Sequence, residues 1–132
     1  MLRSQLLTRY SGVPFSVAFP PRDLLEHYPL PVSGALEPGD DVAYFVPVYA
    51  AAFGGKFTPP VAHYLLTFAR VVGVKEGKAV TVRLRTVDGA EVRKRLSALT
   101  RLVCFRAARE GEQVPSYGER VARGLVHGDM AA

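Results

Sequence analysis

The residues that could carry catalysis or bind a metal are few and widely separated. The three histidines are His27, His63 and His127, and the single cysteine is Cys104. None has a companion at metal-ligand spacing, and the chain has no P-loop, Gly-x-Ser-x-Gly turn or His-Glu-x-x-His motif. One cysteine cannot form an internal disulfide. The adjacent Asp40 and Asp41 lie at an expected turn, where aspartate bonds to nearby backbone. We therefore predict no catalytic residue, metal, cofactor or small-molecule substrate.

Basic residues, in contrast, are concentrated in one part of the chain. The whole sequence has 17 Lys and Arg against 12 Asp and Glu, a formal net charge of +5. Ten of the basic residues and only three acidic ones lie between positions 75 and 109. The remainder is slightly acidic. Such a local excess indicates a polyanionic partner or an anionic surface.

The residue pattern inside this segment predicts a hairpin. Over residues 79–87, apolar Val80, Val82 and Leu84 alternate with Thr81, Arg83 and Arg85, as in a half-buried strand. The Asp88-Gly89 pair supplies the positive φ of a tight turn, and residues 91–96 form the return strand. We expect the core of the domain to contain Val80, Val82, Leu84, Val92, Leu96 and Leu99.

If these two strands pair around the turn, four guanidinium groups share one sheet face. Guanidinium forks suit phosphate or carboxylate oxygens in bidentate geometry. The predicted residues for binding nucleic acid or another anionic partner are Arg83, Arg85, Arg93, Arg95 and Arg101. The alternative is a solvated sheet face that binds nothing.

Composition divides the chain into three parts. Residues 1–38 contain six prolines and predict a mostly extended N-terminal arm, with one short helix over 21–28. Residues 39–106 are rich in strand signals. Within them, 64–74 is a long apolar run that we interpret as a bending strand, with a helix at its front as the alternative. Residues 107–132 form a tail in which Ser116 and Glu119 have the spacing of a capping box before a short helix.

Several segments of the middle part follow one another in a recognisable order. These are Pro38-Gly39-Asp40-Asp41-Val42, the run 69–74, the strand 80–84, the Asp88-Gly89 turn, and the stretch 96–102. Together they resemble an SH3-like small barrel of the Tudor or KOW type. The resemblance implies a mainly β fold of about five strands: three meander strands, an Asp-Gly turn, one helical turn and a closing strand.

Tudor domains that bind methylated side chains do so with an aromatic cage, because a quaternary cation is attracted to ring faces. The resemblance therefore suggests an aromatic surface, for which the candidate rings are Tyr44, Phe45, Tyr49, Phe53 and Phe57. The alternative, which we favour, is that these rings are core residues of a barrel without tryptophan.

The sequence also bears on location. No stretch approaches 18 uninterrupted apolar residues, so no transmembrane segment is expected. Residues 1–22 hold three Arg, three Ser and no acidic residue, a bias that resembles a mitochondrial targeting segment. We therefore expect a mitochondrial protein, with the cytoplasm as the alternative.

These observations favour a non-catalytic accessory subunit of a large assembly. A ribosome-like ribonucleoprotein is the first hypothesis, with binding through a basic barrel face and through arms that order on other subunits. The alternatives are a Tudor-like protein-interaction module and an accessory subunit of a mitochondrial respiratory complex. The expected partners are other subunits and RNA.

Overall fold

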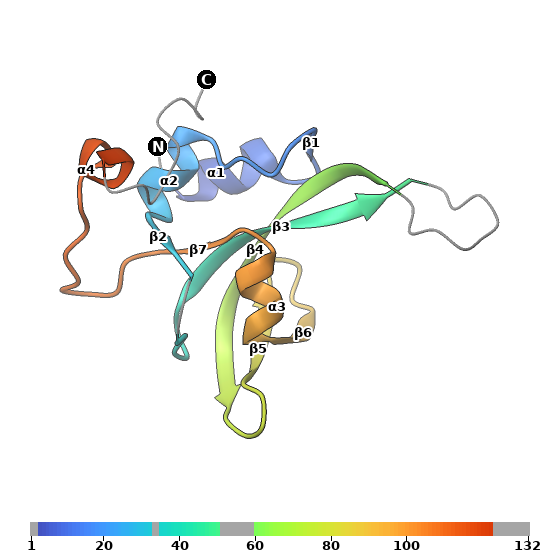
Figure 1. Cartoon of the computed structure of the whole chain (residues 1–132), viewed down its shortest axis with the longest axis vertical. Coiled ribbons are helices and arrows are strands. Elements are labelled where there is room, and N and C mark those ends of the chain that lie inside the picture. The colour runs from blue at the N-terminus through green and yellow to red at the C-terminus, as the bar shows by residue number, and fades with distance from the viewer. Residues whose placement is uncertain (1–2, 33–34, 51–59, 123–132) are drawn as a thin grey trace.

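The computed structural model describes residues 3–32, 35–50 and 60–122 and is mainly β. Its strands form one antiparallel sheet in the order β2-β7-β3-β4-β5-β6, with β1 paired to β4 (Figure 1). The strands are β1 (Pro14–Phe15), β2 (Leu30–Pro31), β3 (Asp41–Tyr49), β4 (Val61–Lys75), β5 (Thr81–Thr86), β6 (Glu91–Arg95) and β7 (Cys104–Arg106). The helices are α1 (Arg3–Tyr10), α2 (Arg22–His27), α3 (Leu96–Arg101) and α4 (Tyr117–Ala122).

The mainly β fold is confirmed, but a closed barrel is not. The end strands of the described sheet, β2 and β6, do not pair with each other. The expected meander over β3, β4 and β5 is present, and α3 stands between β6 and β7 as the expected helical turn. The apolar run 64–74 lies entirely within strand β4, so the bending strand is confirmed and the alternative of a helix at its front is wrong.

The long hairpin of β3 and β4 has apolar side chains on both faces. Along β3, Val42 and Tyr44 pack into one cluster and Ala43 and Phe45 into another. The two sets lie in different clusters because strand residues alternate between the two faces of a sheet, and both sets are buried because both faces are covered. The hairpin therefore separates two hydrophobic clusters.

The cluster on the α3 side contains three of the six predicted core residues as buried members. Val82, Leu84 and Leu99 are buried there, beside Val71 of β4 and Cys104 of β7. The other three predicted core residues, Val80, Val92 and Leu96, are half-buried. The prediction of the inward face of the hairpin is therefore confirmed, and these three residues are less buried than expected.

The other cluster contains two helices of the N-terminal arm: α2, which is the short helix expected over residues 21–28, and α1, which was not expected. Leu6 of α1 and Leu24, Leu25 and Tyr28 at α2 are buried against β3, β4 and β7. Full burial of a leucine side chain stabilises the fold by about 1.5–3 kcal/mol. The prolines made an extended segment the natural prediction, but they lie outside α1 and α2, so these leucines can pack as short helices on the sheet.

The C-terminal segment is held to the rest of the fold by arginines. Arg109 donates to both carboxylate oxygens of buried Asp40, at 2.9 and 2.8 Å. Arg120 of α4 is buried and donates to the backbone carbonyls of Leu25 and Pro29, at 3.2 and 3.0 Å. The expected short helix is present as α4, and the Glu119 N–H donates to the Ser116 hydroxyl at its start.

Candidate anion-binding face

The register between β5 and β6 brings the predicted arginines together. Arg83 lies opposite Arg93, Arg85 opposite Glu91, and Thr81 opposite Arg95. The four arginines are exposed on the face that alternates with buried Val82 and Leu84. The placement follows the period-two pattern of the sequence, and the role in binding stays a prediction.

The hydrogen bonds of this hairpin bring the backbone and Cβ atoms of two arginines especially close. The Thr86 N–H donates to the Ala90 carbonyl and the Leu96 N–H to the Val80 carbonyl, both at 2.9 Å. Even-numbered residues therefore exchange the ladder bonds, and Arg83 and Arg93 form one of the narrow pairs without such bonds. Side chains are closest at these pairs, and like charges directly opposite each other are destabilising.

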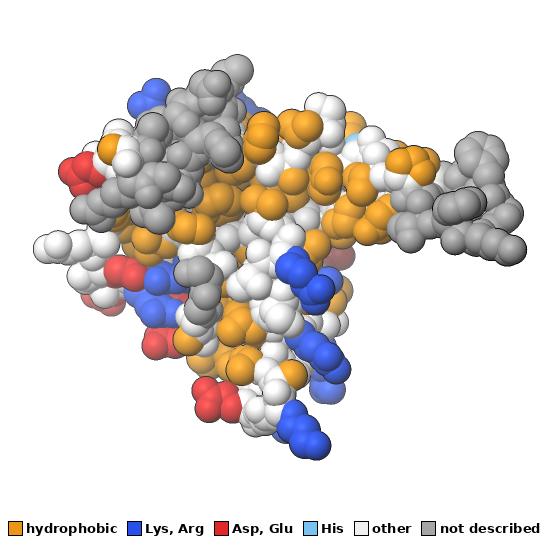
Figure 2. All heavy atoms as spheres, viewed as in Figure 1, with side chains coloured by type: hydrophobic (Ala, Val, Ile, Leu, Met, Phe, Trp, Pro, Cys, Tyr) orange, Lys and Arg blue, Asp and Glu red, His pale blue; other side chains and the backbone are white. Residues whose placement is uncertain are grey.

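Strand β4 extends the same face with two basic residues that sequence reasoning missed. Arg70 lies opposite Arg85, and Lys75 lies opposite Thr81. Residues paired across a sheet share a face. We call the resulting surface the basic face; it consists of Arg70, Lys75, Arg83, Arg85, Arg93 and Arg95. Figure 2 views the molecule from the side of α3, where other Lys and Arg side chains lie over its lower part; the basic face is on the opposite side of the sheet from α3.

A glycine in β4 provides room for one of these side chains. The register between β4 and β5 shifts between Val71 and Gly73, and Gly73 then pairs with Arg83. A Cβ at position 73 would lie 2.5 Å from the Arg83 Nη2 atom, so the guanidinium rests where a side chain is missing. From there Arg83 forms an ion pair with Glu91 at 3.3 Å.

Only part of the charge on the basic face is neutralised. Arg70 pairs with Asp41 at 3.1 Å and Arg83 with Glu91. In the described part of the chain, no ion pair holds Arg85, Arg93 or Arg95. Three exposed guanidinium groups therefore remain available to an external anion.

Two other arginines of the basic segment are already engaged inside the protein. Arg106 donates to both carboxylate oxygens of Glu112, each at 2.7 Å, and this contact lowers the pKa of Glu112 to about 2. Burial raises the pKa of the Asp40 carboxyl, but hydrogen bonds from Arg109 and from the Glu37 N–H outweigh it, so the net pKa is lowered. Arg106 and Arg109 therefore hold the C-terminal segment and are not part of the basic face.

The fifth predicted arginine lies elsewhere. Arg101 is exposed at the end of α3, where its Nε donates to the Ser97 carbonyl at 3.3 Å. The buried residue of that helix, Leu99, packs into the cluster on the opposite side of the sheet from the basic face. Strand register therefore does not bring Arg101 together with the other four.

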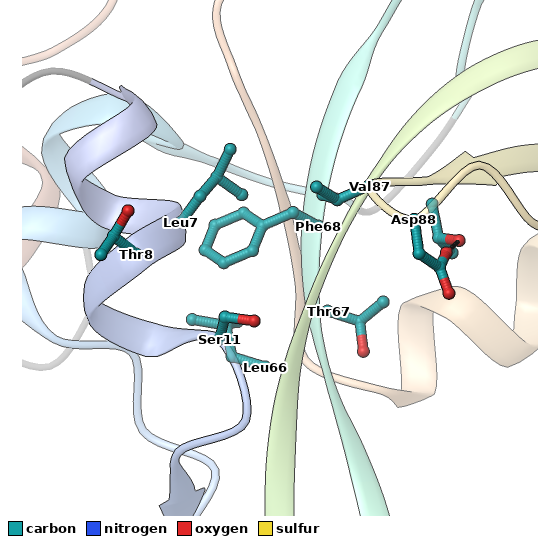
Figure 3. A pocket seen from close by; sticks show the side chains of 9 residues that line it. Leu7, Thr8, Ser11, Leu66, Thr67, Phe68, Val87 and Asp88 are labelled. Carbon is teal, nitrogen blue, oxygen red and sulfur yellow. Dashed lines mark hydrogen bonds between the residues drawn. The ribbon is translucent and has the colours of Figure 1, made fainter.

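A groove with an apolar floor adjoins the basic face. Its larger part, about 560 Å³, lies between α1 and the turn after β5, and Figure 3 shows Leu7 and Phe68 pointing toward each other across it. Its smaller part, about 300 Å³, shares Leu7 and Val87 and reaches Arg70 and Arg85. Val87 is 65% exposed. A ligand bound to the basic face could therefore also contact apolar surface beside Arg70 and Arg85.

The favoured interpretation of the five aromatic residues, that they are core residues, is confirmed for two of them, and the aromatic surface is wrong for those two. Tyr44 and Phe45 are each 1% exposed and lie in different clusters, so neither can contribute to a surface cage. Burial raises the pKa of Tyr44 to about 12. Tyr49 is 52% exposed at the end of β3, while Phe53 and Phe57 lie outside the described residues.

Cys104 is buried, and that burial raises the pKa of its thiol to about 12, so it is a packing residue. Within residues 3–32, 35–50 and 60–122, no three His, Cys, Asp or Glu side chains gather as a metal site would require. No helix in this part of the chain has the length and apolar character to cross a membrane.

Comparisons with known proteins give no relative: no family model matches the chain, and neither a curated protein nor a solved structure matches it. What the chain does is therefore inferred from its own residues and their placement.

Proposed function

We propose that this chain is a non-catalytic subunit of a ribonucleoprotein and that its basic face binds the sugar–phosphate backbone of RNA. The observation that carries the proposal is the exposure of Arg85, Arg93 and Arg95 on one sheet face without an ion-pair partner among the described residues. Unneutralised arginines in this arrangement repel one another; the phosphates of a polyanion neutralise them, and the polyanion releases its own counterions as it binds.

The spacing of the face suits a phosphate backbone. Alternate residues of a strand are about 6.7 Å apart, and adjacent strands about 4.8 Å apart. The face is thus a two-dimensional array of bidentate donors that can follow successive phosphates. It contains no aromatic side chain, so it offers no ring on which a base could stack. We therefore infer binding that depends on charge and backbone shape and depends little on sequence.

An aromatic-cage reader is a weaker candidate, because Tyr44 and Phe45 are core residues. An accessory role in a protein-only assembly, such as a respiratory complex, would use the same face against acidic protein. The mitochondrial location is likewise a proposal, with the cytoplasm as the alternative. Because Leu6 of α1 is buried in a core cluster, we expect residues 3–10 to remain in the working protein wherever it resides.

The relation of this sheet to an SH3-like barrel is also part of the proposal. We infer that β3 to β7 form an open variant of an SH3-like barrel, since the order β7-β3-β4-β5-β6 and the position of α3 agree with the expected meander, helical turn and closing strand. Helices α1 and α2 cover the outer face of β3 and β4 at one end, which leaves the other end to the basic face.

Salt-dependent RNA binding is the test. The affinity of the purified full chain for a structured RNA is measured from 50 to 300 mM salt, with wild type and the double variant Arg85→Gln/Arg93→Gln. Each lost phosphate contact should reduce the slope of log K against log salt by about one, so this variant should lose about two.

A matched control removes the same charge away from the face. The variant Lys78→Gln/Arg101→Gln changes exposed residues at α3, where Lys78 shares a pocket with Ser97 and Thr100. It should keep the wild-type slope. Equal slopes for all three proteins would contradict RNA binding at the basic face, and a complex with cellular partners that survives RNase would favour the protein-only assembly.

A further inference from the structure

Strand β6 has one edge that no other strand of the described sheet covers. In the described sheet β6 is the last strand and pairs only with β5 (Figure 1). The other end of the sheet is protected differently: β2 has two residues, and one of them is Pro31, which has no N–H to offer. Strand β6 has five residues and no proline.

The hydrogen-bond pattern of the hairpin identifies which backbone groups face outward. Because even-numbered residues bond to β5, the N–H and C=O groups of Glu91 and Arg93 point away from it, as does the N–H of Arg95. No backbone bond to these groups is found among the described residues outside the hairpin ladder. The edge therefore offers alternating donors and acceptors to one more strand.

The side chains along this edge determine which strand fits. Arg93 and Arg95 project on the exposed face, with Arg83 directly behind Arg93. On the other face, Val92 and Lys94 are half-buried. A strand rich in basic residues would be repelled, whereas carboxylates at alternate positions would lie beside the two arginines.

We propose that the edge of β6 binds an extended acidic segment of a partner protein by strand addition, with Asp or Glu at every second residue on the arginine side. Backbone bonds to Glu91, Arg93 and Arg95 supply the register, and the carboxylates supply the selectivity. This interaction goes beyond the proposed RNA binding and requires no nucleic acid. Positive charge on the exposed side keeps a second copy of this chain from being the preferred occupant.

The decisive variants separate backbone bonding from charge. The Arg93 N–H points away from β5, so Arg93→Pro removes an outward donor and leaves the bonds within the hairpin. Arg93→Gln removes the same charge and keeps the donor. The probe is an eight-residue peptide that alternates glutamate with valine, measured by fluorescence anisotropy at 150 mM salt without RNA. We expect Arg93→Pro to weaken binding at least tenfold more than Arg93→Gln.

Two further measurements keep the test independent of how well Arg93→Pro folds. The same peptide with alternate backbone nitrogens methylated keeps its charge and should bind wild type at least tenfold more weakly. Hydrogen exchange at the Glu91, Arg93 and Arg95 amides should slow when the unmodified peptide binds, while the Val92 and Lys94 amides are already protected. Equal binding of the two peptides, or equal effects of the two variants, would overturn strand addition. Protection of the odd-numbered amides by dimerisation of the chain alone would assign the edge to a second copy and also overturn it.

Discussion

Replacing Arg93 by glutamate should stabilise the isolated chain while it weakens RNA binding. Arg83 and Arg93 are a directly opposed narrow pair, which puts their backbones about 4.5 Å apart. With the charged groups roughly 8 Å apart in water, the repulsion amounts to about 0.5 kcal/mol. Arg93→Glu changes repulsion into attraction, so the free energy of unfolding should rise by about 1 kcal/mol at low salt. For a chain of this size that raises the melting temperature by about 3–4 °C.

Thermal unfolding followed by circular dichroism in 20 mM and 1 M NaCl measures this effect. The gain should nearly vanish in 1 M salt, where the screening length is about 3 Å. Arg93→Gln should gain about half as much, and Arg101→Glu, at α3, should gain little. RNA affinity of Arg93→Glu should fall at least tenfold. A variant that melts below wild type at low salt, or that gains equally at both salt concentrations, would show that the face is not a self-repelling array.

Three further predictions test other parts of the structure. Leu6→Ala should lower the free energy of unfolding by about 2–5 kcal/mol in urea titrations, against less than half of that for half-buried Leu7→Ala; a loss under about 0.5 kcal/mol would mean that α1 does not pack on the sheet. Val103 has a φ of 48°, so Val103→Gly should relieve left-handed strain and stabilise the chain by about 0.5–1 kcal/mol, and a lower melting temperature would contradict this. Glu112 has its pKa lowered from 4.5 to about 2 by Arg106, so its contribution is present above about pH 4.5 and is lost as the pH falls toward 2. In urea titrations from pH 7 to 2, the advantage of wild type over Glu112→Gln should shrink across that window, and a constant difference would argue against the ion pair.

The features that could be predicted from the sequence are those determined by neighbouring residues. The alternation of Val82 and Leu84 with Arg83 and Arg85 defines two faces without knowledge of the rest of the fold, and the Asp88-Gly89 turn aligns the return strand. Gly89 has the positive φ that this turn requires. The four central arginines of the basic face follow from these local signals alone.

The features that were missed depend on contacts between distant segments. Arg70 and Lys75 join the face through the register of β4 with β5, and an irregularity between Val71 and Gly73 shifts that register by one residue. A shift of one residue would turn side chains to the other face, so the apolar run of β4 alone could not place them. Leu6 is buried because the sheet presents an apolar surface to α1, which the proline content of residues 1–38 does not reveal.

The burial of Tyr44 and Phe45, which we favoured over an aromatic surface, also follows from a local argument. Val42 to Val46 is an unbroken apolar run, and such runs are typical of strands covered on both faces. Tyr44 and Phe45 are adjacent, so they must point to opposite sides, and a strand covered on both sides buries both. An aromatic cage requires rings that converge on one exposed site, which neighbouring strand residues cannot do.

The length of β4 explains why the basic face, where we expect the partner to bind, is left uncovered by α1 and α2. Its 15 residues extend over about 50 Å, far more than the short helices beside it can cover. The half around Leu66 and Phe68 lies under α1 and α2, and the half from Arg70 to Lys75 pairs with β5 beyond them. On the same sheet face, an apolar end therefore gives way to a charged end, with the groove beside Leu7 at the boundary. A partner that covered only the charged end would leave the exposed Val87 in water, so a partner with an apolar group next to its anions should bind more tightly than a simple polyanion.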